Sequence, residues 1–451
     1  MIDIDVKEKI SRIRKIKIIM LVVLCFLTVG LCGIFVYGMM GNNLWFWARD
    51  GRKEGNLFKS PQLVLEQEIP LNGIEQISVL YNMNSNDIHI YEKEGSSLSV
   101  KEYSELALKE DEVSTVVVTG NSLEIKGKKR NIRGAVGIGP FYIGSVRSYT
   151  EIGLPSAYKG QLSFATSSGD ISSEMDFVLE KDFKASTSSG NITVPNILAT
   201  NVNLGCSSGD VAINNVNTQF NDTSGEIVIK TTSGNIDADQ LIGAADIESS
   251  SGDIKIKELT GGTKIKSNSG YIDSEIILGD TQITTSSGDI GVQRIDGIAN
   301  VNSSSGNVKI YAGSGVRNVR TNSGDILLEG VDSAWNIQAS SGSVQIKATT
   351  GSGDINTTSG DVNLDLEELT GDLHINSSSG WAKIKISNDN SFDFEASTSS
   401  GDINTFFDKN LNFNERRNSA NGVYGSNQDQ RRIVVRTTSG DVEVTGYRLT
   451  R

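Results

Sequence analysis

The chain has 451 residues, a length that would hold two or three ordinary domains, although a repeat array can use the same length as one continuous body. Its net charge is -13, and aromatic residues make up only 6% of it. Nucleic acids and anionic lipids are bound through clusters of Lys and Arg, so this acidic balance argues against either as the main ligand. Cations, cationic peptides and neutral glycans stay open as ligands.

The first 40 residues have the pattern of a membrane anchor. Lys and Arg outnumber Asp and Glu by three in residues 1–17, and the 23 residues 18–40 carry no charge. A helix of that length exceeds a bilayer core of about 30 Å. Trp45, Phe46 and Trp47 follow it as an interfacial belt. The pattern predicts a cytoplasmic tail at 1–17, a transmembrane helix at 18–40 and an extracellular remainder, hence a single-pass protein of the cell membrane.

Two alternatives to a retained anchor are a cleaved signal peptide and lipoprotein processing at Cys32. A signal peptide has an apolar core of about 7 to 15 residues that ends in an Ala-x-Ala-like pattern, which Gly38-Met39-Met40 does not match. Leu31 stands where lipoprotein processing needs a small residue. Beyond this segment Cys206 is the only cysteine, so no disulfide forms within one ectodomain, and this usage is typical of a bacterial envelope protein.

A repeat of 18 residues is the strongest signal in the chain. Each copy has a Ser-Gly pair, with an aliphatic residue two positions after the glycine and another five positions before it. The repeated glycines are Gly234, Gly252, Gly270, Gly288, Gly306, Gly324, Gly342 and Gly360. The aliphatic residues that follow them are Ile236, Ile254, Ile272, Ile290, Val308, Ile326, Val344 and Val362.

These columns predict a β-solenoid in which each coil has two main strands and two corners. Stretches such as Asp253–Lys257 alternate apolar and charged residues, the period of a strand with one buried face. Glycine suits a corner that requires a positive φ, and a second glycine often falls halfway, as at Gly243 and Gly261. A single coil cannot bury its apolar face, so stacking at about 4.8 Å per coil builds the core. All five prolines lie before residue 196, which leaves the later chain free for uninterrupted pairing.

The residue after each repeated glycine is often acidic, which raises the possibility of a calcium stripe. Stacked carboxylates repel one another, and the alternation of Asp with Asn, Tyr and Ser relieves that repulsion. We therefore interpret the column as turn residues, with cation binding as the alternative. The column reads Asn235, Asp253, Tyr271, Asp289, Asn307, Asp325, Ser343 and Asp361.

The remaining segments complete the domain prediction. Residues 41–73 are assigned to a stalk or linker, 74–160 to an N-terminal β cap with the first coils, and 161–451 to the solenoid. Residues 406–432 interrupt the motif as a loop insertion that contains Arg416, Arg417, Arg431 and Arg432. Residues 130–147 are glycine-rich and are interpreted as a flexible connector.

Candidates for chemistry are few. The two histidines, His89 and His374, are far apart in the repeat register, and the sequence has no His-Glu-x-x-His motif, nucleophile elbow or paired cysteine ligands. We predict no catalytic, cofactor-binding or metal-binding residues and no cofactor. A β-helical carbohydrate-active enzyme, which needs only carboxylates and basic groups on one face, stays an alternative.

The stretch Glu151–Pro155, followed by Ala165-Thr166-Ser167-Ser168-Gly169-Asp170-Ile171, resembles the bacterial putative-adhesin family of β-strand repeat proteins, a domain of unknown function. The likeness covers about residues 74–451. It implies a right-handed parallel β-helix at the bacterial envelope, and some relatives stand beside envelope-stress regulators. It implies no catalytic residues.

The expected function is therefore that of a non-enzymatic adhesion or scaffold protein of the envelope. Its expected partners are other envelope proteins, wall polymer or a second copy of itself, with the membrane contacted through its own helix and no nucleic acid bound. An envelope-stress sensor is the main alternative. Because the cytoplasmic tail is short, such a sensor would need a membrane partner.

Overall fold

The computed structural model describes residues 60–81, 85–130, 137–138, 141–142, 147–220, 223–426 and 429–448. Within these ranges no helix has the length and apolarity to cross a membrane. The predicted tail, transmembrane helix and most of the stalk lie outside the described residues. The chain divides into two compact units. Residues 58–131 and 146–451 form the solenoid unit, whereas the described part of the other unit is the two-stranded hairpin of β7 (Gly137–Ile138) and β8 (Phe141–Tyr142).

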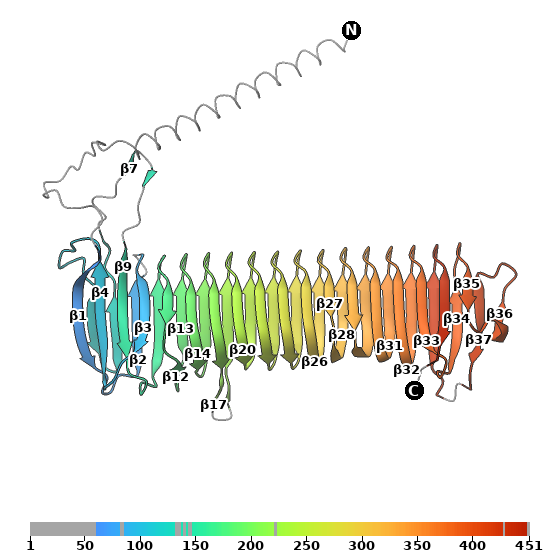
Figure 1. Ribbon diagram of the computed structural model, residues 1–451, viewed down its shortest axis with the longest axis horizontal. Helices are drawn as coiled ribbons and strands as arrows, with labels where there is room; N and C mark the ends of the chain where they lie inside the picture. The colour runs from blue at the N-terminus through green and yellow to red at the C-terminus, as the bar shows by residue number, and fades with distance from the viewer. Residues whose placement is uncertain are drawn as a thin grey trace, which may run out of the picture. The chain divides into compact units, whose positions relative to one another are not determined.

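The solenoid is built from two ladders of parallel strands (Figure 1). Strands that lead into each Ser-Gly corner form the first ladder: β2 (Gln76–Tyr81), β10 (Gln161–Thr166), β13 (Phe183–Thr187), β15 (Val202–Cys206), β19 (Glu226–Thr231), β21 (Ala244–Ser249), β23 (Thr263–Ser267) and β25 (Thr281–Thr285). Strands that leave the corner form the second: β3 (Asp87–Glu92), β11 (Ile171–Ser173), β14 (Ile192–Leu198), β16 (Val211–Asn217), β20 (Ile236–Ile242), β22 (Ile254–Thr260) and β24 (Ile272–Leu278).

Beyond residue 290 the same two ladders continue in strands that differ more in length. They are β26 (Ile290–Ser303), β27 (Val308–Ile310), β28 (Gly313–Thr321), β29 (Ile326–Glu329), β30 (Val331–Ala339), β31 (Val344–Thr357), β32 (Val362–Ser377) and β33 (Ala382–Ser387). Three short strands occur in addition to these two ladders. β12 (Phe177–Val178) pairs with β14, and β17 (Gln219–Phe220) and β18 (Thr223–Ser224) form a hairpin. The all-β parallel prediction is confirmed, and the handedness of the coils stays a prediction.

The aliphatic columns form the core, as the 18-residue period predicts. Ile254, Ile272 and Ile290 are direct partners in neighbouring coils, and each is at most 1% exposed. Every coil adds one layer to this stack, so the buried surface is continuous along the solenoid. Through this continuity each coil is stabilised by its neighbours, as in other repeat proteins.

The corner glycines serve a different purpose from the predicted one. In the Ser-Gly column the glycines do not have positive φ. A Cβ atom on Gly252 would instead lie 1.9 Å from the carbonyl oxygen of Gly234 in the previous coil. The positive φ values fall on the halfway glycines, with 140° at Gly243 and 122° at Gly261. Close stacking of backbones therefore selects the first column, and backbone conformation selects the second.

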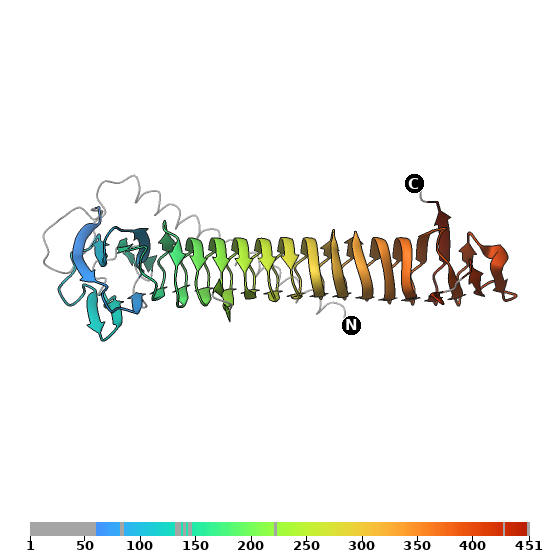
Figure 2. The same cartoon turned by 90° about the horizontal axis from the view of Figure 1, so that it is seen from below.

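An antiparallel cap closes the N-terminal end (Figures 1 and 2). Its strands are β1 (Gln62–Pro70), β4 (Ser97–Ser104), β5 (Thr115–Thr119), β6 (Ser122–Lys126) and β9 (Ser148–Leu154). β6 and β9 pair in parallel with β2 and β3, while β4, β1 and β5 add antiparallel strands outside them. β1 lies in the range assigned to the stalk, and it is a strand there because residues 62–70 pair with β4.

The C-terminal end has an inverted strand order. β38 (Arg432–Thr437) lies between β32 and β34 (Phe392–Ser397), and β39 (Val442–Tyr447) lies between β33 and β35 (Ile403–Thr405). The last coil of the chain is thus inserted before the coil that precedes it in sequence. The stretch predicted as a loop insertion is folded: it contains the 3-10 helix η1 (Asp408–Asn410), β36 (Leu411–Phe413) and β37 (Ser419–Tyr424).

An aromatic cluster explains why that insertion folds. β37 pairs antiparallel with β34. Phe407 packs against Phe392, Phe394 and Tyr424 with ring centroids 5.1 to 5.6 Å apart. The insertion therefore covers the apolar end of the last coil, as a terminal cap must in a solenoid.

Candidate functional site

The acidic column after the corner glycine is a hydrogen-bonded ladder. Each Asp or Asn Oδ1 accepts the backbone N–H of the residue in the same position of the next coil: Asp253 from Tyr271 at 2.8 Å, and Asp325 from Ser343 at 2.8 Å. Asn307 accepts from Asp325 at 2.8 Å in the same way. Only one side-chain oxygen is used, so Asp and Asn are interchangeable in this role. The mixed composition of the column follows from this geometry.

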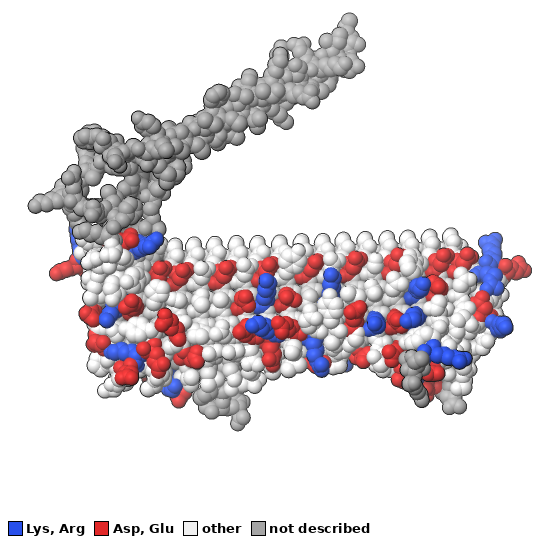
Figure 3. Space-filling model, viewed as in Figure 1, with Lys and Arg blue, Asp and Glu red and all other residues white. Residues whose placement is uncertain are grey.

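Figure 3 shows acidic side chains spaced along the upper edge of the solenoid, beside an uncharged rim. Among the residues that the structure describes, no three His, Cys, Asp or Glu side chains are close enough to hold a metal ion together. The hydrogen bonds give the column a structural role, as the turn interpretation predicts.

A second polar column lies inside the corner, three residues before the glycine. Ser249 Oγ accepts the N–H of Gly252 at 3.0 Å, and Thr321 Oγ1 accepts that of Gly324 at 3.0 Å. Cys206 occupies the same position, and its Sγ accepts the N–H of Gly209 at 2.9 Å. Burial raises the pKa of the Cys206 thiol. This cysteine is therefore a buried corner residue rather than a reactive thiol.

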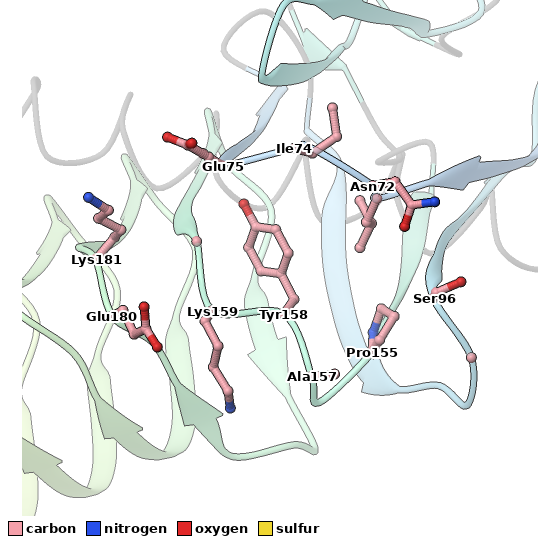
Figure 4. Close-up of a pocket in the computed structure, with 13 residues that line it drawn as sticks. Asn72, Ile74, Glu75, Ser96, Pro155, Ala157, Tyr158, Lys159, Glu180 and Lys181 are labelled. Carbon is pink, nitrogen blue, oxygen red and sulfur yellow. The ribbon is translucent and has the colours of Figure 1, made fainter.

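A hollow of about 480 Å³ lies where the N-terminal cap meets the first coils (Figure 4). Two lysines and two glutamates line it: Lys159, Lys181, Glu75 and Glu180. Tyr158 stands in its middle and donates a hydrogen bond to the carbonyl oxygen of Gln161 at 3.2 Å. Burial, with the Glu75 carboxylate as a second cause, raises the pKa of Tyr158. The two lysines and two glutamates of this hollow balance in charge, and the Tyr158 hydroxyl donates its hydrogen bond within the protein.

A different surface of the cap gathers aromatic and acidic side chains. We call it the tyrosine face and define it as His89, Tyr91, Tyr103, Tyr149, Glu151, Ser172 and Glu174. Tyr103 of β4 and Tyr149 of β9 are opposite residues, stacked with centroids 4.6 Å apart and planes inclined by 15°. His89 of β3 lies edge-on to Tyr149, at 5.8 Å and 67°. A hollow of about 380 Å³ lies beside them, lined by His89, Ile90, Tyr91, Glu151, Ser172 and Glu174.

Burial and nearby charges shift the pKa values of Tyr103 and of Lys101 beside it. Burial, and then the Glu151 carboxylate, raise the pKa of Tyr103. Glu66, followed by Tyr91 and Tyr103, raises the pKa of Lys101 at the edge of the face. The Tyr103 phenol therefore stays protonated and Lys101 stays charged at neutral pH.

The structure does not bring the two histidines together. His89 Nδ1 is 2.7 Å from Ser172 Oγ on the tyrosine face. His374 Nδ1 is 3.0 Å from Asp354 Oδ1, on strands near the other end of the solenoid. The tyrosine face is not predicted from the sequence. The alternation of apolar and polar residues in 87–92, 97–104 and 148–154 indicates which of their side chains point outward, but not that they form one surface.

The arginines of the insertion are not a free basic patch. Arg417 pairs with Asp408 at 2.9 Å and lies 4.0 Å from the centroid of Phe413. Arg431 pairs with Asp429 at 3.0 Å, and Arg432 lies 3.7 Å from Glu395. These pairs neutralise much of the positive charge that the sequence shows there.

Three solved structures match this chain at low similarity. They are a protein from Clostridium sporogenes named a putative cell adhesion protein (9% identity, TM-score 0.17), one from Parabacteroides distasonis named a putative lipid binding protein (14%, 0.16) and a putative adhesin from the same organism (14%, 0.16). Each match covers 86% of this chain, and 100%, 96% and 97% of the respective structure. TM-scores this low carry no argument about function.

No curated protein matches the sequence. The family profile described as Toastrack DUF4097 matches residues 74–280 and 273–445, which cover nearly all of the solenoid unit. These two matched ranges are the coils and caps described above. The chain therefore belongs to the Toastrack DUF4097 family.

Proposed function

We propose that this protein is a non-enzymatic adhesion or scaffold protein of the bacterial cell envelope, which presents the side faces of a rigid solenoid to envelope proteins or wall polymer. The observation that carries the proposal is the continuous parallel core closed by a folded cap at each end. Such a body holds its outward side chains in fixed positions along its length. Such a surface can bind envelope proteins or wall polymer without a conformational change.

The caps also bear on self-association. A bare last coil would offer unpaired backbone groups to another copy. Here β4 and β1 cover the first coil, and β37 and β36 cover the last. The cap strand β1 carries Glu66, Glu68 and Pro70 and has a register shift between Leu63 and Leu65, features that discourage edge pairing. We therefore rank contact with other envelope components above end-to-end assembly.

The anchor belongs to the same proposal. The uncharged stretch 18–40 would hold the solenoid at the cell membrane as a single pass, with the N-terminus in the cytoplasm and the solenoid outside. The coils would wind right-handed, the usual hand of parallel crossover connections. An envelope-stress sensor and a carbohydrate-active enzyme are the competing functions.

Crosslinking in intact envelopes tests the proposal. The full chain, tagged at its C-terminus, would be crosslinked and recovered, and both proteins and glycans would be identified. Wall polymer or structural envelope proteins should be enriched over a tagged, unrelated membrane protein. Recovery of a single signalling membrane protein would favour the sensor, shortened wall polymer would favour the enzyme, and no enrichment would contradict all three.

A further inference from the structure

We infer that the tyrosine face is a saccharide-binding site, selective for neutral and amino sugars over anionic ones. The inference rests on the proposed function, since it names the chemistry through which the cap would contact wall polymer. It concerns a surface that is separate from the corner ladder and from the hollow around Tyr158.

The aromatic part of the face is a platform for a sugar ring. The C–H bonds on one side of a pyranose are weakly positive, and the face of a phenol ring is negative, so the two attract when they stack. Tyr103 and Tyr149 are half-buried, and their mutual stacking fixes their ring planes. Tyr91 completes the surface on β3, opposite Gly153 of β9. A Cβ atom at Gly153 would lie 2.7 Å from the Tyr91 hydroxyl, so the glycine lets that ring lie across β9.

The hollow beside the platform supplies the hydrogen bonds. Sugar hydroxyls donate and accept, and they need partners of both kinds. Glu151 and Glu174 offer carboxylate acceptors, while Ser172 and His89 can donate or accept. The volume of about 380 Å³ lies within the range of roughly 300–1,000 Å³ typical of small-molecule sites.

Charge sets the selectivity. Two carboxylates face the hollow, and no Lys or Arg is among the described residues that line it. Lys101, the register partner of Glu151 at the edge of the face, pairs with Glu66 at 3.5 Å. A uronate or a phosphorylated sugar would be repelled by these carboxylates, whereas an ammonium group of an amino sugar would be attracted.

The support beneath the face is rigid. His89, Glu151 and Lys101 are register partners on the neighbouring strands β3, β9 and β4, so backbone hydrogen bonds fix their spacing. Residues between them on the same strands, such as Ile90, Val100 and Ile152, are at most 1% exposed. A site on packed strands is held closer to its binding geometry than a site on a loop.

Calorimetric titration of the full chain tests the inference. The probes are the β-1,4 tetramer of N-acetylglucosamine, the corresponding glucosamine tetramer and tetragalacturonate. The first two should bind and the third should not. Tyr149→Ala should weaken binding about tenfold, Tyr149→Phe should retain it, and Tyr271→Ala, which removes an exposed tyrosine elsewhere, should change nothing. Glu151→Gln with Glu174→Gln should weaken the glucosamine tetramer more than the acetylated one.

The inference is overturned if none of the probes binds the unaltered chain at millimolar concentration, if tetragalacturonate binds best, or if Tyr149→Ala binds as the unaltered chain does. Circular dichroism of each variant would separate lost binding from lost folding, and the Phe and Gln variants keep the test open if Tyr149→Ala does not fold. Envelope partners recovered by crosslinking alongside a failed titration would overturn this inference alone.

Discussion

Each glycine of the Ser-Gly corner lies where a side chain would overlap the backbone of the coil before it. The 18-residue spacing of these glycines could be read from the sequence, but their reason could not. A positive φ and a close approach both select glycine, and only the distance between coils decides between them. The same holds for the Asp and Asn column, whose one-sided hydrogen bonds become visible only when successive coils are stacked.

Substitution at two glycines of one coil, neither of which has a positive φ, tests the close approach between coils. Gly288→Ala would place its Cβ 1.9 Å from the carbonyl oxygen of Gly270, whereas Gly291→Ala would meet nothing closer than Asp273 Oδ1 at 3.4 Å. We expect a loss of about 2 kcal/mol or more for Gly288→Ala, from overpacking against backbone, and a neutral or slightly stabilising effect for Gly291→Ala. Chemical denaturation measures both. Equal effects would show that close stacking is not what selects the corner glycine.

The ladder predicts a difference between amide and alkyl replacements. Asp325→Asn keeps the Oδ1 that accepts the N–H of Ser343 and should leave stability nearly unchanged. Asp325→Ala loses that acceptor and should cost about 1 kcal/mol. Thermal unfolding with and without calcium chloride checks the alternative as well. A large rise in melting temperature on adding calcium, lost in Asp325→Asn, would favour the alternative that this column binds cations.

A buried ion pair closes the N-terminal cap. Glu102 is fully buried and pairs with Arg130, and it also accepts hydrogen bonds from the hydroxyl and backbone N–H of Ser114 at 2.8 and 3.1 Å. Arg130→Met leaves the Glu102 carboxylate buried without its cation and should cost about 3–5 kcal/mol. Adding Glu102→Gln should recover part of that loss, since the neutral amide is cheaper to bury. A double variant less stable than Arg130→Met by denaturation would argue against this account of the pair.

At the scale of elements, the inverted order at the C-terminal end is the feature that the sequence did not reveal. The repeat motif showed a skipped coil between Gly401 and Gly440, but the pairing partners of β38 and β39 are distant in the chain. The stacking of corner glycines follows the same inverted order, from Gly380 to Gly440 to Gly401. A Cβ on Gly440 would lie 1.9 Å from the carbonyl oxygen of Gly380, and one on Gly401 would lie 2.2 Å from that of Gly440. The last coil of the chain therefore lies between two coils formed by earlier residues.

Truncation tests that arrangement. A chain that ends at residue 431 lacks β38 and β39, so four strands, β32, β33, β34 and β35, each lose a ladder partner. The apolar neighbours of Ile433, Val435, Val442 and Val444 lose their cover. We expect aggregation or filaments by light scattering, while a control chain ending at Tyr447 stays monodisperse. A monodisperse shorter chain with unchanged hydrogen exchange in β32 and β34 would contradict the inserted position of the last coil.

The N-terminal cap shows the same limit of prediction from a sequence. Four of its strands, β4, β5, β6 and β9, lie within the predicted range 74–160, whereas β1 lies in the range assigned to the stalk. Their arrangement was not foreseen, because β3 pairs with β9 across a glycine-rich connector and β1 returns to β4 in antiparallel fashion. The tyrosine face exists only through these non-local pairings, so its residues could be found singly in the sequence but not as one surface.

On the scale of the whole molecule, the solenoid unit combines a uniform interior with an uneven surface. The lateral faces carry short charge ladders, such as Lys230, Glu248 and Lys266 on three successive coils, and exposed pairs of this kind add little stability. Aromatic groups lie at both ends: the tyrosine face, beside acidic side chains, at the N-terminal cap and the cluster around Phe407 at the C-terminal end. A body of packed coils that carries a polar-aromatic surface at its N-terminal cap agrees with the proposed contact with a glycan, which requires no moving part.

Co-sedimentation with purified bacterial wall polymer, with new reducing ends counted in the same samples, tests the central claim most directly. The account predicts that the full chain sediments with the polymer, that Tyr149→Ala sediments less, and that no new reducing ends appear. A chain that stays in the supernatant, or one that releases reducing ends, would contradict a binding protein that leaves its glycan intact.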